Sequence, residues 1–228
     1  MRKAHLMMLI ALVAVLSCVQ PALADDITTT IGSSTLFTNG QTGIGAGTYS
    51  TAVAGQPAPF NAFCGSNSSA NCNTNWTFNY TVPAGDTITG ATLTLGVLDL
   101  DSSINSTPFA SFTLGADNLT AAMNSAADAL DGGTGSANKE YDVLTISLDS
   151  FLSDLAGGDA TFALTTQGPG FGVLGDTKDL GVGLVFSSLD ITATAAQGGG
   201  GGVTPVPEPG TLPLLGIGLL ALTVALRK

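Results

Sequence analysis

The most regular pattern in the chain is an alternation of apolar and polar residues with a period of two. It is clearest over residues 75–82, where Trp76, Phe78 and Tyr80 point one way and Asn and Thr residues point the other. Successive side chains of an extended strand lie on opposite faces, so this pattern predicts a half-buried β-strand. After a Pro-Ala-Gly-Asp turn, the same alternation returns over residues 88–100.

The remaining candidate strands are short, and turn-rich spacers separate them. They lie at residues 26–31, 109–114, 141–148, 160–165 and 181–194. Helical segments are scarce, and we expect only short ones at 119–130 and 149–155. Neither supplies the helix between successive strands that an α/β fold requires. The sequence therefore predicts an all-β fold, a single antiparallel β-sandwich of the jelly-roll kind, over residues 25–197.

The N-terminal segment has the three parts of a secretory signal peptide. A basic pair opens the chain, an apolar stretch follows, and Ala22 and Ala24 form an A-x-A site. We expect signal peptidase to remove residues 1–24. One alternative is an uncleaved membrane anchor, for which the apolar stretch is short. A second is lipidation at Cys18, although the A-x-A site downstream is the better formed of the two.

The C-terminal segment has a different organisation. A glycine run opens a Gly/Pro linker at 198–206, and Pro207, Glu208 and Pro209 follow it. An uncharged apolar helix is expected at 212–226, ahead of a basic pair that ends the chain. At a rise of about 1.5 Å per residue, that helix covers about two-thirds of a hydrocarbon core about 30 Å thick. If the helix spans with the help of neighbouring residues, the positive-inside rule predicts that the basic pair lies in the cytoplasm and the sandwich outside.

This order of tripeptide, short hydrophobic helix and basic end, at 207–228, resembles the PEP-CTERM sorting signal. The resemblance implies that an exosortase, a membrane-embedded cysteine protease, cuts near the tripeptide. It also implies transient membrane anchoring and a final location at the cell surface or outside the cell. The family further implies a Gram-negative bacterium that makes exopolysaccharide. The alternative is a plain C-terminal anchor behind a Pro-rich spacer.

Charge excludes several classes of function. The chain has 17 Asp and Glu against 6 Lys and Arg, and only Lys139 and Lys178 lie between its two ends. Such a body lacks the cations that neutralise phosphates in nucleic-acid binding. His5 is the single histidine and lies within the expected signal peptide. The mature chain then has no histidine for a Ser-His-Asp triad or a metal site, and we expect no enzyme.

Cys64 and Cys72 are the cysteines that remain after signal cleavage. They flank a loop of Gly, Ser and Asn residues that offers little packing of its own. In an oxidising compartment this pair predicts a disulfide. Closing so small a loop stabilises the fold by about 2–3 kcal/mol in the chain-entropy model. A zinc site is the alternative, but two thiols without histidine supply too few ligands.

Asp99 and Asp101 form a D-x-D at the end of the second predicted strand. Two carboxylates at this spacing either share one side of the strand or bracket its exit, and β-sandwiches often hold Ca²⁺ in this way. Further loop carboxylates able to add ligands are Asp131, Asp142, Asp176 and Asp179. The alternative is that these Asp residues are solvated and end strands. A glycosidase pair would also need a cleft walled by aromatic residues.

Trp76 is the first candidate for an aromatic platform that binds sugar, but its place in the alternating run favours burial in the core. We expect an exported, exosortase-sorted structural protein without catalytic activity, at the cell surface or in a biofilm matrix. Its contacts would be with exopolysaccharide or with other copies of itself. The alternative is a calcium-assisted carbohydrate-binding module.

Overall fold

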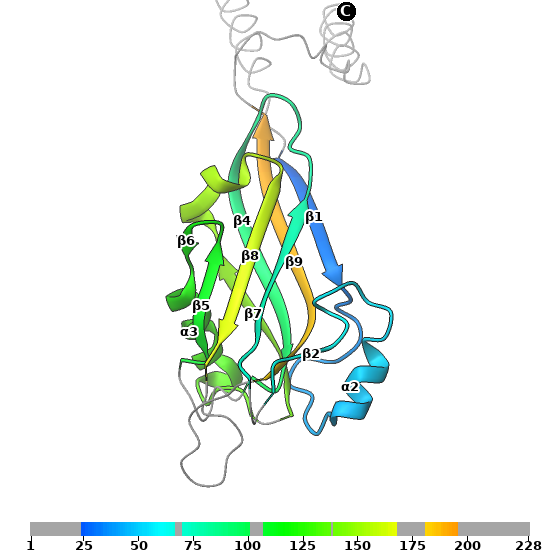
Figure 1. Cartoon of the computed structure of the whole chain (residues 1–228). Coiled ribbons are helices and arrows are strands. Elements are labelled where there is room, and N and C mark those ends of the chain that lie inside the picture. Colours follow the sequence, from blue (N-terminus) through cyan, green and yellow to red (C-terminus); the bar gives the residue numbers. More distant parts are fainter. Residues whose placement is uncertain (1–23, 67–69, 101–106, 138, 168–180, 196–228) are drawn as a thin grey trace, which may run out of the picture. The chain divides into compact units, whose positions relative to one another are not determined.

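The computed structural model describes residues 24–66, 70–100, 107–137, 139–167 and 181–195 (Figure 1). The chain divides into two compact units, 1–196 and 197–228, and all the described residues belong to the first. The expected signal peptide, apart from Ala24, lies outside the described residues, as do the linker and the sorting tail. Within the first unit, two antiparallel sheets pack as a sandwich, which confirms the predicted fold class.

The two sheets combine strands that are far apart in the sequence. The five-stranded sheet has the order β1 (Ala24–Gly32), β9 (Val182–Ala195), β4 (Asp86–Leu98) and β7 (Tyr141–Ser147), and the short β2 (Phe63–Cys64) also pairs with β9. The four-stranded sheet has the order β3 (Asn73–Asn79), β8 (Asp159–Thr166), β5 (Phe109–Leu114) and β6 (Asp117–Asn118). With β2 set aside, this strand order is typical of jelly rolls.

The core between the sheets follows from the period-two pattern. On β4, the apolar positions Leu93, Leu95 and Val97 are buried and face the other sheet. The four-stranded sheet adds Trp76, Phe78, Phe109, Phe112 and Phe162 to this core, and the segment just before β2 adds Phe60. Each such ring buries about 150–250 Å², so these residues dominate the hydrophobic contribution to folding.

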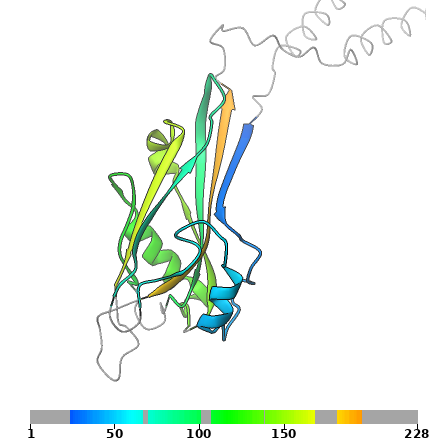
Figure 2. The ribbon, with the colours of Figure 1, turned by 45° about the vertical axis from the view of Figure 1, so that its right-hand side comes forward.

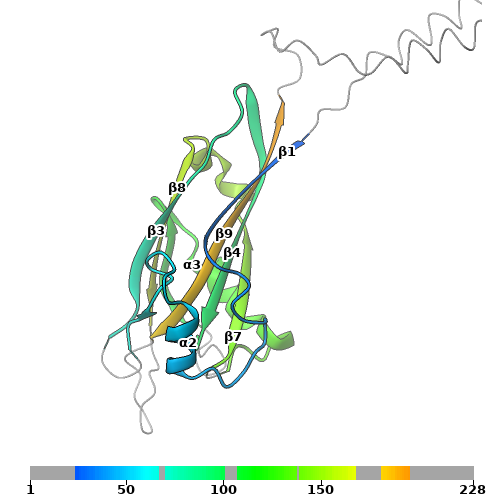
Figure 3. The ribbon, with the colours of Figure 1, turned by 90° about the vertical axis from the view of Figure 1, so that its right-hand side faces the viewer.

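Two helical segments complete the core where the sequence predicted them. Helix α3 (Thr120–Asp128) buries Met123 and Ala127 and lies between β5 and β7 (Figure 3). The Oδ1 atom of Asn118 accepts a hydrogen bond at 2.9 Å from the N–H of Thr120, the first residue of α3. A short 3₁₀ turn, Leu130–Gly132, follows α3, and a second 3₁₀ segment, η2 (Asp149–Leu155), packs against β4 and β8.

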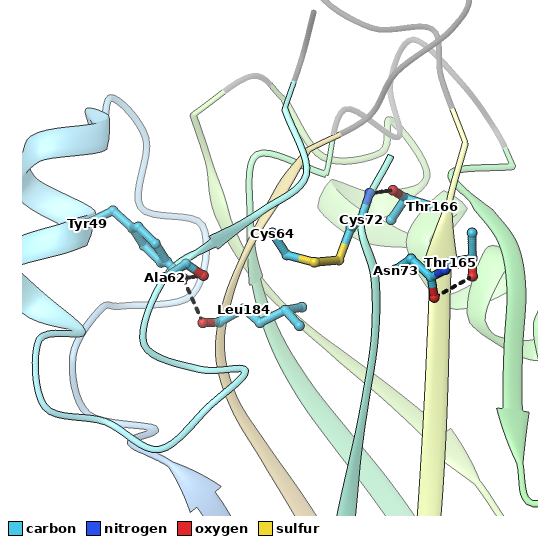
Figure 4. The surroundings of a disulfide bond; sticks show 8 residues. All are labelled: Tyr49, Ala62, Cys64, Cys72, Asn73, Thr165, Thr166 and Leu184. Carbon is cyan, nitrogen blue, oxygen red and sulfur yellow. Dashed lines mark hydrogen bonds between the residues drawn. A yellow bond between two sulfur atoms is a disulfide. The ribbon is translucent and has the colours of Figure 1, made fainter. Parts of the chain in front are cut away.

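Residues 33–62, which we call the covering segment, were not predicted to form any element. They contain the seven-residue helix α2 (Ala46–Ala52), and their residues Leu36, Phe37, Ile44, Tyr49 and Val53 pack on the outer face of the five-stranded sheet. Tyr49 of α2 is fully buried there, beside Tyr141 and Phe186. Its hydroxyl donates to the carbonyls of Ala62 at 3.1 Å and Leu184 at 2.8 Å (Figure 4).

The five-stranded sheet therefore has two different ends. At the covered end, β1 ends, β9 begins and α2 lies against the sheet (Figure 2). At the exit end, β1 begins beside the end of β9, with Ala24 opposite Thr194 (Figure 1). The segment toward the signal peptide and the segment toward the sorting tail thus both leave the sandwich at the exit end.

Candidate functional site

Asp99, the first residue of the D-x-D, lies at the covered end, where β4 stops. The strand ends at Leu98 because Asp99 adopts a left-handed conformation with φ 64°. Asp99 is 8% exposed, and its Oδ1 accepts the Lys139 N–H at 2.7 Å. Asp99 thus brackets the strand exit rather than continuing the alternation predicted over 88–100. Asp101 lies outside the described residues, so its part in any site stays a prediction.

A second group of carboxylates begins the neighbouring strand β7. Glu140 is 4% exposed and Asp142 is 1% exposed. Asp142 is paired with Val97 of β4, a core-facing residue, so its carboxylate also faces the space between the sheets. The Ser136 hydroxyl donates a short hydrogen bond to Asp142 Oδ2, and the Ala137 N–H donates to Glu140 Oε2 at 2.8 Å.

The fold brings these carboxylates together with a third. Oxygens of Asp131, Glu140 and Asp142, the carboxylate cluster, all lie within 4.8 Å of one another. Asp99 adjoins the cluster, since its N–H donates to the Glu140 carbonyl at 2.9 Å. Lys139 is the one basic residue in the part of the chain that the structure describes, and its side chain is exposed.

The electrostatics of the cluster favour a bound proton or cation. The pKa of Asp142 is raised to about 6, first by its burial and then by the charges of Glu140 and Asp131. The Ser136 hydrogen bond acts in the opposite direction. Uncompensated carboxylates at this separation are costly because burial weakens the screening of their repulsion.

The geometry suits Ca²⁺ chemically. Two oxygens that both lie about 2.3–2.6 Å from one ion are separated by at most about 5 Å, which agrees with the spread of the cluster. The sequence identified Asp99, Asp131 and Asp142 as possible ligands but missed Glu140. A signal was present: Glu140-Tyr141-Asp142 repeats the acidic spacing of Asp99 and Asp101, and the two motifs end or begin neighbouring strands.

The prediction of Trp76 as a surface platform for sugar is wrong. Its side chain is 4% exposed and packs in the core, with ring centroids of Phe60, Phe112 and Phe162 at 5.5, 6.1 and 6.0 Å. The alternation along β3 directs the indole inward, as the position of Trp76 in the alternating run had favoured. No ring face of Trp76 is therefore free to stack on a sugar.

The predicted disulfide between Cys64 and Cys72 is present, with a Cα–Cα distance of 4.8 Å (Figure 4). Cys64 ends β2 in the five-stranded sheet, and Cys72 directly precedes β3 in the other sheet. Cys72 is fully buried, and its N–H donates to Thr166 Oγ1 at 2.9 Å. The bond therefore links the two sheets at the covered end, close to the covering segment.

The residues of the two export signals lie almost entirely outside the described residues. This applies to Ala22 and to the sorting tripeptide Pro207, Glu208 and Pro209, whereas Ala24 is the first residue of β1. Cleavage after Ala24 stays a prediction. Within the described residues, no helix has the length and apolar character needed to cross a membrane.

Comparison with known proteins identifies the C-terminal segment. Residues 205–228 match the family model of the PEP-CTERM protein-sorting motif, which confirms the resemblance seen in the sequence. The motif implies processing by exosortase, so the chain is an exported protein that exosortase sorts to the cell surface. Among curated proteins, the chain finds no match.

Proposed function

We propose that this protein is a noncatalytic component of the cell surface or extracellular matrix, associated with exopolysaccharide. The observation that carries the proposal is the outer face of the five-stranded sheet, beyond the covering segment. Eight polar side chains form two rows across four strands there, which we call the hydroxyl face. Its rows are Thr28, Asp190, Thr92 and Ser147, and Thr30, Ser188, Thr94 and Thr145.

The hydroxyl face suits contact with a hydrated polymer. Cross-strand hydrogen bonds join Thr28 to Asp190 at 2.6 Å and Thr30 to Ser188 at 2.8 Å, which holds the side chains in a fixed array. Strand geometry spaces the side chains about 4.8 Å apart across the sheet and about 6.7 Å apart along each strand. Such a surface makes many weak polar contacts, and a long polysaccharide converts weak contacts into retention by avidity.

The four-stranded sheet has an outer face of similar character. Asn73, Asn75 and Asn79 of β3 are exposed. Thr77 pairs with Thr161 of β8 through a hydroxyl hydrogen bond at 2.8 Å. Neither face carries a basic side chain, which agrees with a neutral polymer partner better than with an acidic one.

Retention in the matrix tests the proposal. In a host with exosortase and exopolysaccharide, the double variant Thr92→Val/Thr94→Val removes two hydroxyls from the centre of the hydroxyl face at constant shape. We expect the fraction retained with the polysaccharide to fall several-fold at unchanged melting temperature. Thr51→Val, which removes an exposed hydroxyl on α2 outside both polar faces, is the control. Equal retention of the double variant and the wild type would contradict a role for the hydroxyl face.

A second candidate function is a calcium-assisted carbohydrate-binding module. The carboxylate cluster favours it, since Asp131, Glu140 and Asp142 would hold the ion and leave coordination positions for vicinal sugar hydroxyls. Ca²⁺ takes six to eight oxygen ligands, more than three carboxylates supply as single oxygens. This arrangement would replace the aromatic platform that Trp76 does not provide.

Calorimetry separates the two candidates. Titration of the wild type with Ca²⁺ should release or absorb heat and raise the melting temperature, and Asp142→Asn should abolish both effects. Asp190→Asn, on the hydroxyl face, controls for the loss of one negative charge. If Ca²⁺ gives neither heat nor a thermal shift in the wild type, the second candidate is rejected and the first is unaffected.

A further inference from the structure

The outer edge of β1 offers a row of backbone hydrogen-bonding groups. The Thr29 carbonyl accepts from the Ser188 hydroxyl at 3.4 Å, and the Ser33 N–H donates to the Val185 carbonyl at 3.4 Å, so both residues face β9. Backbone groups alternate in direction along a strand. The N–H and C=O groups of Asp26, Thr28 and Thr30 therefore point away from the sheet.

The covering segment pairs with the opposite edge of the same sheet at the start of β7. The Gly40 N–H donates to the Tyr141 carbonyl at 2.8 Å, and the Tyr141 N–H donates to the Gln41 carbonyl at 2.9 Å. The Val143 N–H donates to Asn39 Oδ1 at 2.7 Å. No comparable cover lies on β1 among the described residues, whose only backbone pairing for this strand is with β9.

The sequence of β1 does not protect this edge. Natural edge strands are commonly blunted by Lys, Pro or a bulge, which hinder pairing with another strand. Residues 27–31 read Ile-Thr-Thr-Thr-Ile, all strong strand formers, and the β1–β9 register has no bulge. The only charges on β1 are Asp25 and Asp26, near its start.

We propose that β1 pairs with β1 of a second copy of this chain, antiparallel about a twofold axis at Thr28. In this register the two β1 strands overlap along their whole length. Residues whose backbone N–H and C=O groups point away from one sheet lie opposite the equivalent residues of the other copy. It places Asp26 opposite Thr30 of the second copy. The same chemistry already stabilises the β1–β9 pair, where Thr28 donates to Asp190 at 2.6 Å.

Electrostatics disfavour the neighbouring register centred on Asp26, whereas a register centred on Thr30 would shorten the overlap of the two strands. A twofold axis at Asp26 would place two carboxylates directly opposite each other, which destabilises a strand pair. With the axis at Thr28, the acidic ends of the two strands lie at opposite ends of the joint. The paired sheets would continue the hydroxyl face across both copies.

The direction of pairing sets where the exit ends of the two copies lie in the dimer. Both chain ends leave the sandwich at the exit end, because Ala24 lies opposite Thr194. An antiparallel β1 pair places the two exit ends on opposite sides of the dimer. This inference names the partner within the proposed matrix function, and it rests on that function for its setting only.

Cysteine cross-linking of the full chain in detergent tests the register. Residues paired at the axis have Cα atoms about 5.5 Å apart, within disulfide range, so Thr28→Cys should give a disulfide-linked dimer under mild oxidation. The Asp26 positions of the two copies would be about 13 Å apart, so Asp26→Cys alone should cross-link at least tenfold less. A mixture of Asp26→Cys and Thr30→Cys should restore the dimer. Thr145→Cys, on the hydroxyl face at the β7 edge, is the matched control.

A second variant measures association without a cross-link. Thr28→Pro removes an outward N–H while the β1–β9 hydrogen bonds remain, so the melting temperature should change little and sedimentation should show loss of the dimer. Equal cross-linking at 26, 28 and 145, or none at 28, would overturn the inference. Cross-linking with no matrix retention would instead reject the polysaccharide role and leave the β1 pairing standing.

Discussion

The two ends of the outer face of the five-stranded sheet share their strands but not their character. Toward the exit end, β4 and β9 present Thr92, Thr94, Ser188 and Asp190 to solvent. Toward the covered end, the same strands present Phe186 and other apolar residues, and the covering segment buries them. A strand reads as alternating where one face is solvated and as a continuous apolar run where both faces are covered.

This difference separates two tasks within one sheet. The covered end holds the groups that need a rigid surrounding, which are the disulfide, the buried Tyr49 and the carboxylate cluster. Among the residues that the structure describes, none covers the exit end, which keeps an open polar surface and an open strand edge. We therefore expect the stability of the fold to depend on the covered end. Contacts with partners are expected to depend on the open part of the sheet.

Removal of the Tyr49 side chain should have the largest effect. Tyr49→Ala leaves a cavity under α2 and deletes both hydroxyl hydrogen bonds, and we expect a loss of about 3–5 kcal/mol in the free energy of unfolding. Tyr49→Phe keeps the packing but leaves two carbonyls without their donor, for a loss of about 1–3 kcal/mol. Urea denaturation measures both. Thr51→Ala, exposed on the same helix, should change stability by less than about 0.5 kcal/mol. A similar small change for Tyr49→Ala would show that the cover contributes nothing.

The disulfide is expected to rank next. Cys64→Ser/Cys72→Ser opens the link between the two sheets at the covered end and should cost about 2–3 kcal/mol. Because the hydroxyl face lies away from this bond, polysaccharide retention below the melting temperature should stay unchanged. Thermal unfolding followed by circular dichroism gives the first quantity. A parallel loss of retention in the folded variant would show that the two ends are not independent.

A pair of glycines on β4 compares the two ends directly. A Cβ at Gly96, under the cover, would lie 2.5 Å from the Phe186 ring and 2.6 Å from the Tyr141 hydroxyl. Gly96→Ala should therefore overpack this site and cost about 1–3 kcal/mol. At Gly90, near the exit end, the nearest atom would be Asp149 Oδ1 at 3.5 Å, an ordinary contact. Gly90→Ala should change the free energy of unfolding by less than about 0.5 kcal/mol. Equal losses for the two variants in denaturant titrations would show that the covered and exit ends do not differ in packing.

The smallest expected effect is a pH dependence from the carboxylate cluster. Burial raises the pKa of Asp142 to about 6, above the ordinary value of 3.8, so the folded state binds a proton more tightly than the unfolded state. Stability without Ca²⁺ should therefore rise by about 1 kcal/mol as the pH falls from about 7 to 5. Asp142→Asn should flatten this slope. In Asp149, the Ala91 N–H holds the pKa below its usual range, so Asp149→Asn is the control and should leave the slope unchanged. An unchanged slope in Asp142→Asn would show that another group titrates.

Most strands were predictable because their pattern is local. The expected range 109–114 coincides with β5, and the range 141–148 differs from β7 by one residue. The covering segment was missed because α2 has seven residues, no side-chain cap and no clear amphipathic period. Its apolar residues Tyr49 and Val53 become informative only when the sheet beneath them is known.

The candidate site was predictable only in part, for a related reason. Asp99, Asp131 and Asp142 were identified as acidic residues near strand ends, but nothing in their spacing indicates that the Asp142 carboxylate faces the core. That orientation follows from the pairing of Asp142 with Val97, a partner on another strand. Trp76 shows the opposite case, because the period of its own strand already favoured burial.

The sequence by itself determined most of the strands, the paired cysteines and the sorting motif, since each depends on residues that are neighbours in the chain. Only the tertiary structure decided which face of β4 and β9 is covered, which carboxylates meet and which sheet edge stays open. These features depend on contacts between segments far apart in the sequence, such as Gln41 with Tyr141 and Ala24 with Thr194. A local period states that a residue faces one side of a strand, and the packing of the other strands decides what it meets there.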